Sequence, residues 1–303
     1  MYNHGSNMLR SFANSHKVRR ALQQLEFFVC ADLFMTETAQ LADIVLPAGT
    51  WMERSYVHDN SQATYNTVQK QEKVATYGEA WSDFKILNEL AKRLGFGHYF
   101  FEKEEDIPEW RAKLLGMSWA DLKEKGGLIS RPMEYRKYEN AGFKTASGKV
   151  EIYSKAMEEL GLTPLPSYLE PTESPLSSPD LFREYPYILT TGARPSIFRH
   201  TEYRNVKRLV AKMPYPPAYM HPDTARQVGV VDGDEVTLSN RRGRMLAVAE
   251  VTLGIAPGVV QVPHGWEGAM NVNYLTNDQD CAPGIGSAQL RGLLCNVTKG
   301  WDL

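Results

Sequence analysis

The pattern of apolar and polar residues in the first fifty positions is typical of an α/β sheet. Phe27 to Ala31 is an unbroken apolar run that ends at Asp32, and Asp43 to Pro47 is a second segment that a proline stops. Such segments predict two strands that are buried on both faces. Thr36 lies between them and can cap a short helix from Glu37 to Ala42. A strand, a short helix and a further strand imply a parallel crossover.

Three segments are predicted to be helical: one after Ser15, one from Ser82 to Leu94, and one from Glu105 to Lys125 that is interrupted at Gly116. Ser15 and Ser82 can cap the first two helices. In the third, Ser118 and Asp121 have the spacing of a capping box. The helix from Ser82 is expected to bury one apolar stripe, which comprises Phe84, Leu87, Leu90, Ala91 and Leu94.

The composition of the chain changes after residue 161. Residues 162–186 are dense in proline, which opposes helices and central strands and predicts an extended linker. Beyond it, short β-branched runs alternate with turns, a pattern typical of a compact β barrel. Arg242-Gly243 is one of these turns, and we expect Arg242 to face solvent. The runs are Glu235 to Leu238, Leu246 to Leu253 and Val259 to Val262.

Together these patterns predict a fold of the α/β plus β class. Residues 1–161 are expected to form an incomplete parallel-sheet, Rossmann-like α/β domain, residues 162–186 a proline-rich linker, and residues 187–303 a β-barrel domain. The Gly/Asn-rich turn at residues 2–7 resembles the turn after a strand that the sequence does not contain. We therefore expect the chain to be a piece of a longer protein, and the sequence does not decide whether Met1 is a natural start.

Composition narrows the classes of function. The chain has 303 residues, of which 43% are hydrophobic and 23% charged, and its net charge is −2. This near-neutral charge gives no reason to expect nucleic acid as a partner. No apolar stretch approaches the roughly 20 residues that span a bilayer, so no membrane insertion is expected. Cys30, Cys281 and Cys295 lie far apart without a Cys-x-x-Cys pair, which argues against a zinc or iron–sulfur site built by this chain alone.

Two segments are candidates for ligand binding, because open α/β sheets bind ligands beyond the carboxyl ends of their strands. The turn at Gly5, Ser6 and Asn7 could offer backbone amides to a phosphate. The segment from Asp32 to Thr38 could offer a helix amino end to an anion, or the Asp32 carboxylate to a ribose or a guanine edge. Glycine turns and capping threonines are also common structural features, and both interpretations stay open.

Segments in order along the whole chain resemble the molybdopterin-dependent oxidoreductases of the dimethyl sulfoxide reductase family. The resemblance rests on VCADLFMTETAQLADIVLPA (29–48), GEAWSDFKILNELAKRLG (78–95), GFKTASGKVEIYS (142–154), YILTTGARPSIFRHT (187–201), HPDTARQVGVVDGDEVTLSNRRGRM (221–245), PGVVQVPHGW (257–266) and NVNYLT (271–276). Enzymes of this family hold molybdenum or tungsten between two pterin cofactors, usually as molybdopterin guanine dinucleotides. The resemblance implies that residues 1 to about 160 are the returning half of a discontinuous nucleotide-binding domain, and that residues from about 185 form a double-psi β-barrel.

The resemblance also implies a set of cofactor-binding residues. In the first domain these are Gly5, Asn7, Asp32 and Thr36. In the barrel they are Thr191, Gly192, Arg194, His200, Thr201, His264 and Asn273. The chemistry agrees, because a pterin needs amide, imidazole and hydroxyl partners and a pyrophosphate suits a guanidinium. The family usually has Thr-Gly-Arg where this chain has Ala193 before Arg194, which leaves the partner of Arg194 open.

The resemblance places the remaining chemistry outside this sequence. The iron–sulfur cysteines and the Cys, selenocysteine or Ser that ligates the metal lie upstream in the family, so this chain is expected to supply neither catalytic residues nor metal ligands. Its expected partners are the missing amino-terminal half and an iron–sulfur electron-transfer subunit. The isolated chain is expected to be inactive and to hold no cofactor stably.

Several alternatives stay open. The parent could belong to the family's non-redox hydratase branch, the chain could be a separate cofactor-binding or assembly module, or the barrel could only mediate protein contacts. The sequence decides neither the substrate nor whether the protein is cytoplasmic or exported with its parent.

Overall fold

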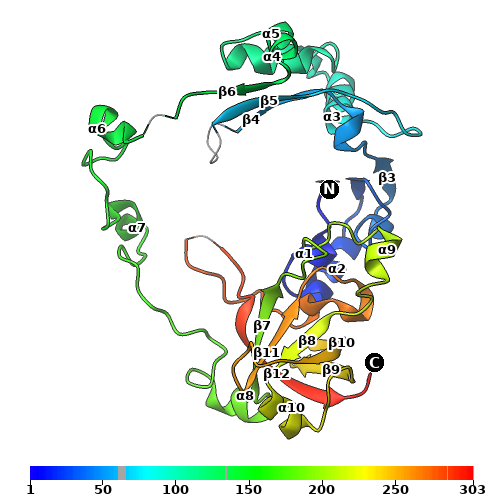
Figure 1. The fold of residues 1–303 in the computed structure, drawn as a ribbon, viewed down its shortest axis with the longest axis vertical. Coiled ribbons are helices and arrows are strands. Elements are labelled where there is room, and N and C mark those ends of the chain that lie inside the picture. Colours follow the sequence, from blue (N-terminus) through cyan, green and yellow to red (C-terminus); the bar gives the residue numbers. More distant parts are fainter. Residues whose placement is uncertain (61–65, 134, 285, 303) are drawn as a thin grey trace. The chain divides into compact units, whose positions relative to one another are not determined.

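The chain folds into two compact units. The computed structural model describes residues 1–60, 66–133, 135–284 and 286–302. One unit, which we call the α/β unit, comprises Met1–Ser6 and Glu26–Glu151, and the other, the barrel unit, comprises Asn7–Leu25 and Ile152–Leu303 (Figure 1). Residues 7–25 and 152–161 were expected in the first domain, but they belong to the barrel unit. The physical reason for the first of these segments is a set of hydrogen bonds from barrel asparagines, described below.

The α/β unit contains a three-stranded parallel sheet of order β1-β2-β3. β1 is Tyr2–His4, β2 is Val29–Asp32 and β3 is Ile44–Pro47. Both predicted strands are therefore present, and the 3-10 turn η1, Ala39–Leu41, replaces the short helix expected between them. β2 is buried, with Cys30 fully inaccessible, but Ile44 of β3 is 45% exposed. Burial on both faces was the wrong expectation for β3, because it is an edge strand of this sheet.

The helix α3, Asp83–Arg93, begins as predicted, with Ser82 accepting a hydrogen bond from the Lys85 amide. Of its predicted apolar stripe, burial is confirmed for Ala91, whereas the expectation for the three leucines was wrong. The buried residues are Ile86, Asn88 and Ala91, whereas Leu90 is 42% exposed. Spacing alone does not show which face a neighbouring element covers.

A second small sheet in the α/β unit was not expected from the sequence. Its antiparallel strands are β4 Tyr56–Asp59, β5 Thr67–Gln71 and β6 Leu128–Ser130. Helices α4, Asp106–Leu114, and α5, Trp119–Glu124, pack on it around Val57, Val68, Ala112 and Leu122. The predicted capping box of α5 is confirmed at Ser118 and Asp121. The other short elements of this unit are η2 Trp51–Glu53, η3 Gly97–Tyr99 and α6 Lys137–Ala141.

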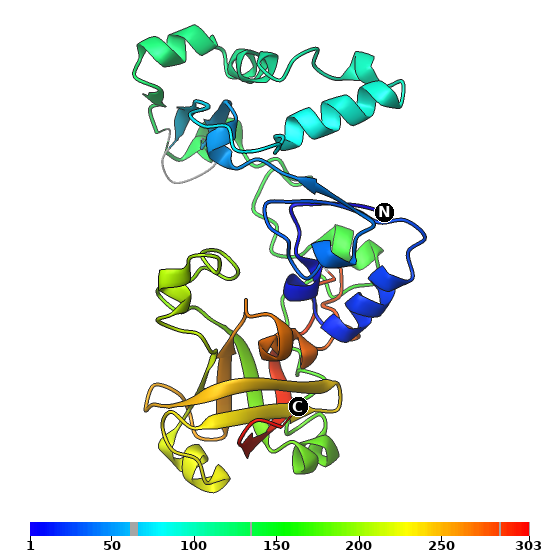
Figure 2. The ribbon, with the colours of Figure 1, turned by 90° about the vertical axis from the view of Figure 1, so that its right-hand side faces the viewer.

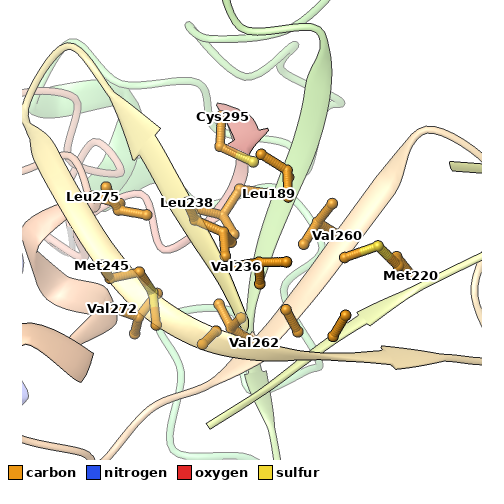
Figure 3. Close-up of a cluster of buried hydrophobic side chains, with 14 of the residues drawn as sticks. Leu189, Met220, Val236, Leu238, Met245, Val260, Val262, Val272, Leu275 and Cys295 are labelled. Atoms are coloured by element: carbon orange, nitrogen blue, oxygen red, sulfur yellow. The ribbon is translucent and has the colours of Figure 1, made fainter. Parts of the chain in front are cut away.

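The barrel unit is built on a closed barrel with strand order β10-β8-β11-β7-β12-β9. The strands are β7 Tyr187–Ala193, β8 Pro217–Met220, β9 Glu235–Asn240, β10 Gly243–Val251, β11 Val259–Pro263 and β12 Arg291–Lys299. Alternate residues of these strands point inward, and Figure 3 shows Leu189, Met220, Leu238, Val260 and Cys295 meeting in the core. β7 runs parallel to β11 and antiparallel to β12. The carboxyl ends of β7 and β11 and the start of β12 therefore share one end of the barrel.

The barrel unit also contains short helices and 3-10 turns. They are α1 Met8–Ser11, α2 Ser15–Gln23, α7 Lys155–Glu159, α8 Pro179–Glu184, α9 Lys207–Val210, α10 Pro222–Val228, η4 Gly268–Met270 and η5 Val272–Tyr274. Figure 2 shows α1 and α2 beside the turns η4 and η5. The cap of α2 is Asn14, which accepts from the Lys17 amide, rather than the expected Ser15. Ser15 instead donates its hydroxyl to the Leu9 carbonyl.

Residues 162–186 are not simply the expected extended linker. Helix α8 lies within them, because a proline at the first turn of a helix costs no hydrogen bond. Glu173 is buried and binds Arg241 and Arg242 of the β9–β10 turn. Arg242 was expected to face solvent, but only 11% of its side chain is exposed. Among the described residues, no helix combines the length and the apolar character needed to cross a membrane.

Candidate functional site

The end of the barrel where β7 and β11 finish gathers most of the predicted barrel residues. Thr191 is buried near the end of β7 and donates its hydroxyl to the Leu290 carbonyl over 2.7 Å. Gly192 follows with a φ of +93°, and a Cβ there would lie 3.4 Å from Nη2 of Arg291. The Arg291 guanidinium therefore lies close over Gly192, and a larger residue would crowd it. Arg194, just beyond the strand, is exposed.

Two histidines meet at this end. Nδ1 of His200 contacts Nε2 of His264, and the rings stack with centroids 4.3 Å apart at 15°. Gly265 makes this approach possible, because a Cβ at its φ of +106° would overlap with the His200 carbonyl. Burial lowers the pKa of His264 to about 4, and the charges of His200, Arg194, Arg204 and Arg291 add to the effect. His264 is therefore neutral at pH 7, with one donor and one acceptor nitrogen.

A third arginine, Arg204, is held between two aromatic rings. Its guanidinium carbon lies 3.8 Å from the ring centroid of Phe198 and 3.3 Å from that of Trp266. Its Nε donates to the His200 carbonyl over 3.3 Å, whereas its buried Nη2 has no hydrogen-bond partner within the described part of the chain. Burial lowers its pKa to about 9, and the charge of Arg10 adds to this. A pKa of about 9 still leaves Arg204 charged at pH 7.

Arg10 is brought to the site by two asparagines of the NVN segment. Asn271 donates its amide to the Leu9 carbonyl and Asn273 donates to the Arg10 carbonyl, both over 2.8 Å. These bonds satisfy carbonyls of the short helix α1 that have no partner in the helix. The Arg10 side chain is 8% exposed and pairs with Glu267.

The predicted barrel residues thus divide into two groups. Thr191, Gly192, His200 and His264 lie together, and Arg194 is close enough to act on the His264 charge. Thr201 contributes its backbone, since its amide nitrogen would be 3.3 Å from a Cβ on Gly265. The polar atoms of Asn273 bind the protein itself, because Nδ2 donates to Arg10 and Oδ1 accepts from the Thr276 hydroxyl.

The residues predicted in the first domain are only partly brought together. Gly5 has a φ of +58° and donates its amide to the Ala31 carbonyl, next to Asp32. Asp32 accepts hydrogen bonds from the Leu33 amide over 2.7 Å and from the Thr36 hydroxyl over 3.5 Å. Gly5, Asp32 and Thr36 therefore share the carboxyl edge of the parallel sheet. Asn7 precedes α1 and belongs to the barrel unit.

Sequence reasoning missed Arg10, Arg204 and Arg291. No motif marks them, although Phe198 and Trp266 both lie in segments that carry the family resemblance. Within the described residues Arg194, Arg204 and Arg291 form no ion pair, so this barrel end is strongly positive in a chain of net charge −2. Such a site suits an anion with several oxygens.

The described residues contain no group of three or more His, Cys, Asp or Glu side chains placed to hold a metal ion. Cys30 and Cys295 are buried, and burial raises the pKa of both thiols. Neither is suited to be a thiolate ligand where it stands.

Comparison with known proteins gives the family. Residues 187–293 match a molydopterin dinucleotide binding domain, and residues 1–93 match the molybdopterin oxidoreductase family. Acetylene hydratase from Syntrophotalea acetylenica is 34% identical over 261 residues, covering 86% of this chain and 36% of that protein. Dimethyl sulfoxide/trimethylamine N-oxide reductase from Rhodobacter capsulatus is 28% identical over 291 residues, covering 86% of this chain and 35% of that protein.

The structures agree over nearly the whole chain. The solved acetylene hydratase from Pelobacter acetylenicus superposes with a TM-score of 0.88 at 32% identity, covering 99% of this chain and 44% of that one. The chain thus spans about two fifths of the length of these relatives. The expected fold class, a parallel-sheet α/β domain followed by a double-psi β-barrel, is confirmed. The chain belongs to the molybdopterin oxidoreductases of the dimethyl sulfoxide reductase family.

Proposed function

We propose that this chain is the cofactor-binding portion of a molybdenum- or tungsten-dependent oxidoreductase that acts on a small solute. The single observation that carries the proposal is the convergence of Arg194, Arg204 and Arg291 beside the His200–His264 pair, without an ion pair among the described residues. Positive charges gathered around one group are stabilised when an anion binds among them. A pterin guanine dinucleotide supplies such an anion in its pyrophosphate.

The residues present fit this group. Nη2 of Arg204 is a buried donor without a partner in the described chain. Glycine at positions 192 and 265 places no side chain against Arg291 and the His200 carbonyl. Nε2 of neutral His264 contacts His200, which leaves its Nδ1 to form one hydrogen bond with a pterin. Arg194 and Arg291 would bind the pyrophosphate, Arg194 by a bidentate pair. The bound cofactor would supply the metal centre at which substrate is converted.

The α/β unit has a second place for the nucleotide. The Gly5 turn and the Asp32–Thr36 loop lie at the carboxyl edge of the parallel sheet. Open α/β sheets bind nucleotides at this edge. We propose that Asp32 accepts hydrogen bonds from the guanine or ribose of one dinucleotide and that Asn7, in the barrel unit, contributes to cofactor binding.

We further propose that the metal ligand and an iron–sulfur cluster are supplied by an amino-terminal half of the same enzyme, and that an iron–sulfur subunit delivers electrons. The proposal is supported by the share of the relatives that the chain spans and by the thiols described above.

A second candidate function is non-redox hydration. It is favoured by one observation, the 0.88 TM-score to an acetylene hydratase over 99% of this chain. The two functions differ in their need for an electron donor or acceptor. Turnover of the enzyme that contains this chain with a viologen dye indicates the oxidoreductase, whereas conversion of acetylene without any dye indicates the hydratase.

The proposed site is tested by the cofactor content of that enzyme. Arg194→Ala should lower pterin and metal per polypeptide, since hydrogen bonds to charged groups contribute about 1.5–3 kcal/mol and each 1.4 kcal/mol is about tenfold in affinity. Arg183→Ala is the matched control, because Arg183 lies on α8 with 76% of its side chain exposed. Equal cofactor contents in wild type and both variants would remove the proposed role of Arg194.

A further inference from the structure

The environment of Arg204 does not resemble that of a structural arginine. Its guanidinium carbon lies within 4 Å of the centroids of two aromatic rings, Phe198 and Trp266. The two rings are nearly perpendicular, at 80°, and contact the guanidinium from two sides, while its Nε bond to the His200 carbonyl fixes its direction. With the guanidinium carbon against two rings and Nε bonded, Nη2 is held in place without any partner among the described residues.

This arrangement is unfavourable unless something else binds there. A buried charged group with an unmade hydrogen bond loses its hydration without compensation. The neighbours of Arg204 make the cost larger, because Arg10 is near enough to lower its pKa and no carboxylate in the described chain pairs with it. The carboxylate of Glu267 is already paired with Arg10. In folded proteins such a group is completed by water, an ion or a ligand, and the positive charge beside it favours an anionic oxygen.

We propose that Arg204 is a ligand-binding residue whose Nη2 donates to a phosphoryl oxygen of the dinucleotide's pyrophosphate. The inference rests on the proposed function and adds a residue that no sequence motif indicated. The site favours arginine over lysine, because a guanidinium donates from Nε to the His200 carbonyl and still presents a separate nitrogen, Nη2, to a ligand. Arg10, held by Asn273, and Arg291, held over Gly192, provide the surrounding positive charge.

The inference can be tested on the 303-residue chain with inorganic pyrophosphate as the probe. Isothermal titration calorimetry at low salt should show binding to the wild-type chain, and Arg204→Lys should weaken it about tenfold or more. The matched control is Arg208→Gln, four residues away on α9 and exposed, which should bind like wild type. Acetate in place of pyrophosphate should bind far more weakly, because it lacks phosphoryl oxygens. Equal binding of acetate would overturn the assignment to a phosphoryl group.

A second measurement on folded protein covers the case in which Arg204→Lys does not fold. Because the guanidinium lies against Trp266, pyrophosphate should change tryptophan fluorescence in the wild-type chain, and Trp266→Phe should lose that change. No calorimetric binding to the wild-type chain, or wild-type affinity in Arg204→Lys, overturns the inference. So does a fluorescence change that persists in Trp266→Phe. The proposed function is judged separately by the cofactor content of the Arg194→Ala enzyme, so either can fail alone.

Discussion

Arg242, in the β9–β10 turn of the barrel, forms an ion pair with Glu173 in the segment 162–186. Replacing Arg242 by alanine tests how much this ion pair stabilises the fold. Its Nη2 donates to the Glu173 carboxylate over 2.8 Å and its Nε donates to the Leu275 carbonyl over 2.8 Å. Glu173 is almost fully buried, with 3% of its side chain exposed. Removing one partner of a buried ion pair costs about 3–5 kcal/mol, because the remaining charge is left without compensation.

The lower end of that range is expected for Arg242→Ala. Arg241 still donates to the Glu173 carboxylate over 2.6 Å and keeps part of the compensation, although its side chain is 56% exposed. We therefore expect a loss of about 3 kcal/mol in the free energy of unfolding, measured by urea denaturation. Arg183→Ala, which removes an exposed pair with Asp180, should change the free energy little.

The dependence on pH has a definite sign. Burial raises the pKa of Glu173, but the hydrogen bonds and charges of Arg242 and Arg241 outweigh it and hold the pKa below the usual 4.5. The pair therefore stabilises the fold above the unfolded pKa, and the contribution is lost as the pH falls through the folded value. In acid, the difference in the free energy of unfolding between Arg242→Ala and wild type should become smaller. A difference below about 1 kcal/mol at pH 7, or one that grows in acid, would refute the reasoning.

Three further predictions concern other parts of the chain. Asn273→Asp should lower the free energy of unfolding by about 3 kcal/mol in urea denaturation, because a carboxylate would face the Arg10 carbonyl; a change within the error of wild type would contradict this. Limited proteolysis should cut first within residues 162–170, which are largely exposed, rather than near buried Glu173 or inside the barrel strands, and a first cut inside a barrel strand would be incompatible with a closed barrel. The purified chain by itself should contain no molybdenum or tungsten and should not turn over viologen dyes, and stoichiometric metal in elemental analysis would defeat this.

The parts of the fold that could be predicted from sequence depend on neighbours along the chain. The cap at Ser82 and the capping box at Ser118 involve residues three positions apart. The run before Asp32 likewise predicts a strand, because its continuous apolar character needs no distant partner to be recognised. The stripe of α3 failed for the opposite reason, since its exposure depends on which elements lie beside it.

Contacts between residues that are distant in sequence could not be predicted, both at Arg242 and at the candidate site. Arg242 lies in a turn, as its sequence suggests, yet it is buried because Glu173, 69 residues earlier, binds it. Arg10 and Arg204 come from distant segments and meet only after the barrel closes, so spacing gives no sign of their convergence. Resemblance to the family supplied Arg194 and His264, because those residues lie inside segments that match in order along the chain.

The most direct test of the proposed site is an experimental structure of the cofactor-loaded enzyme that contains this chain. The account predicts a pterin beside His264 and pyrophosphate oxygens within hydrogen-bond distance, about 3 Å, of the guanidinium groups of Arg194 and Arg204. A cofactor bound elsewhere, with Nη2 of Arg204 meeting water or protein, would contradict it.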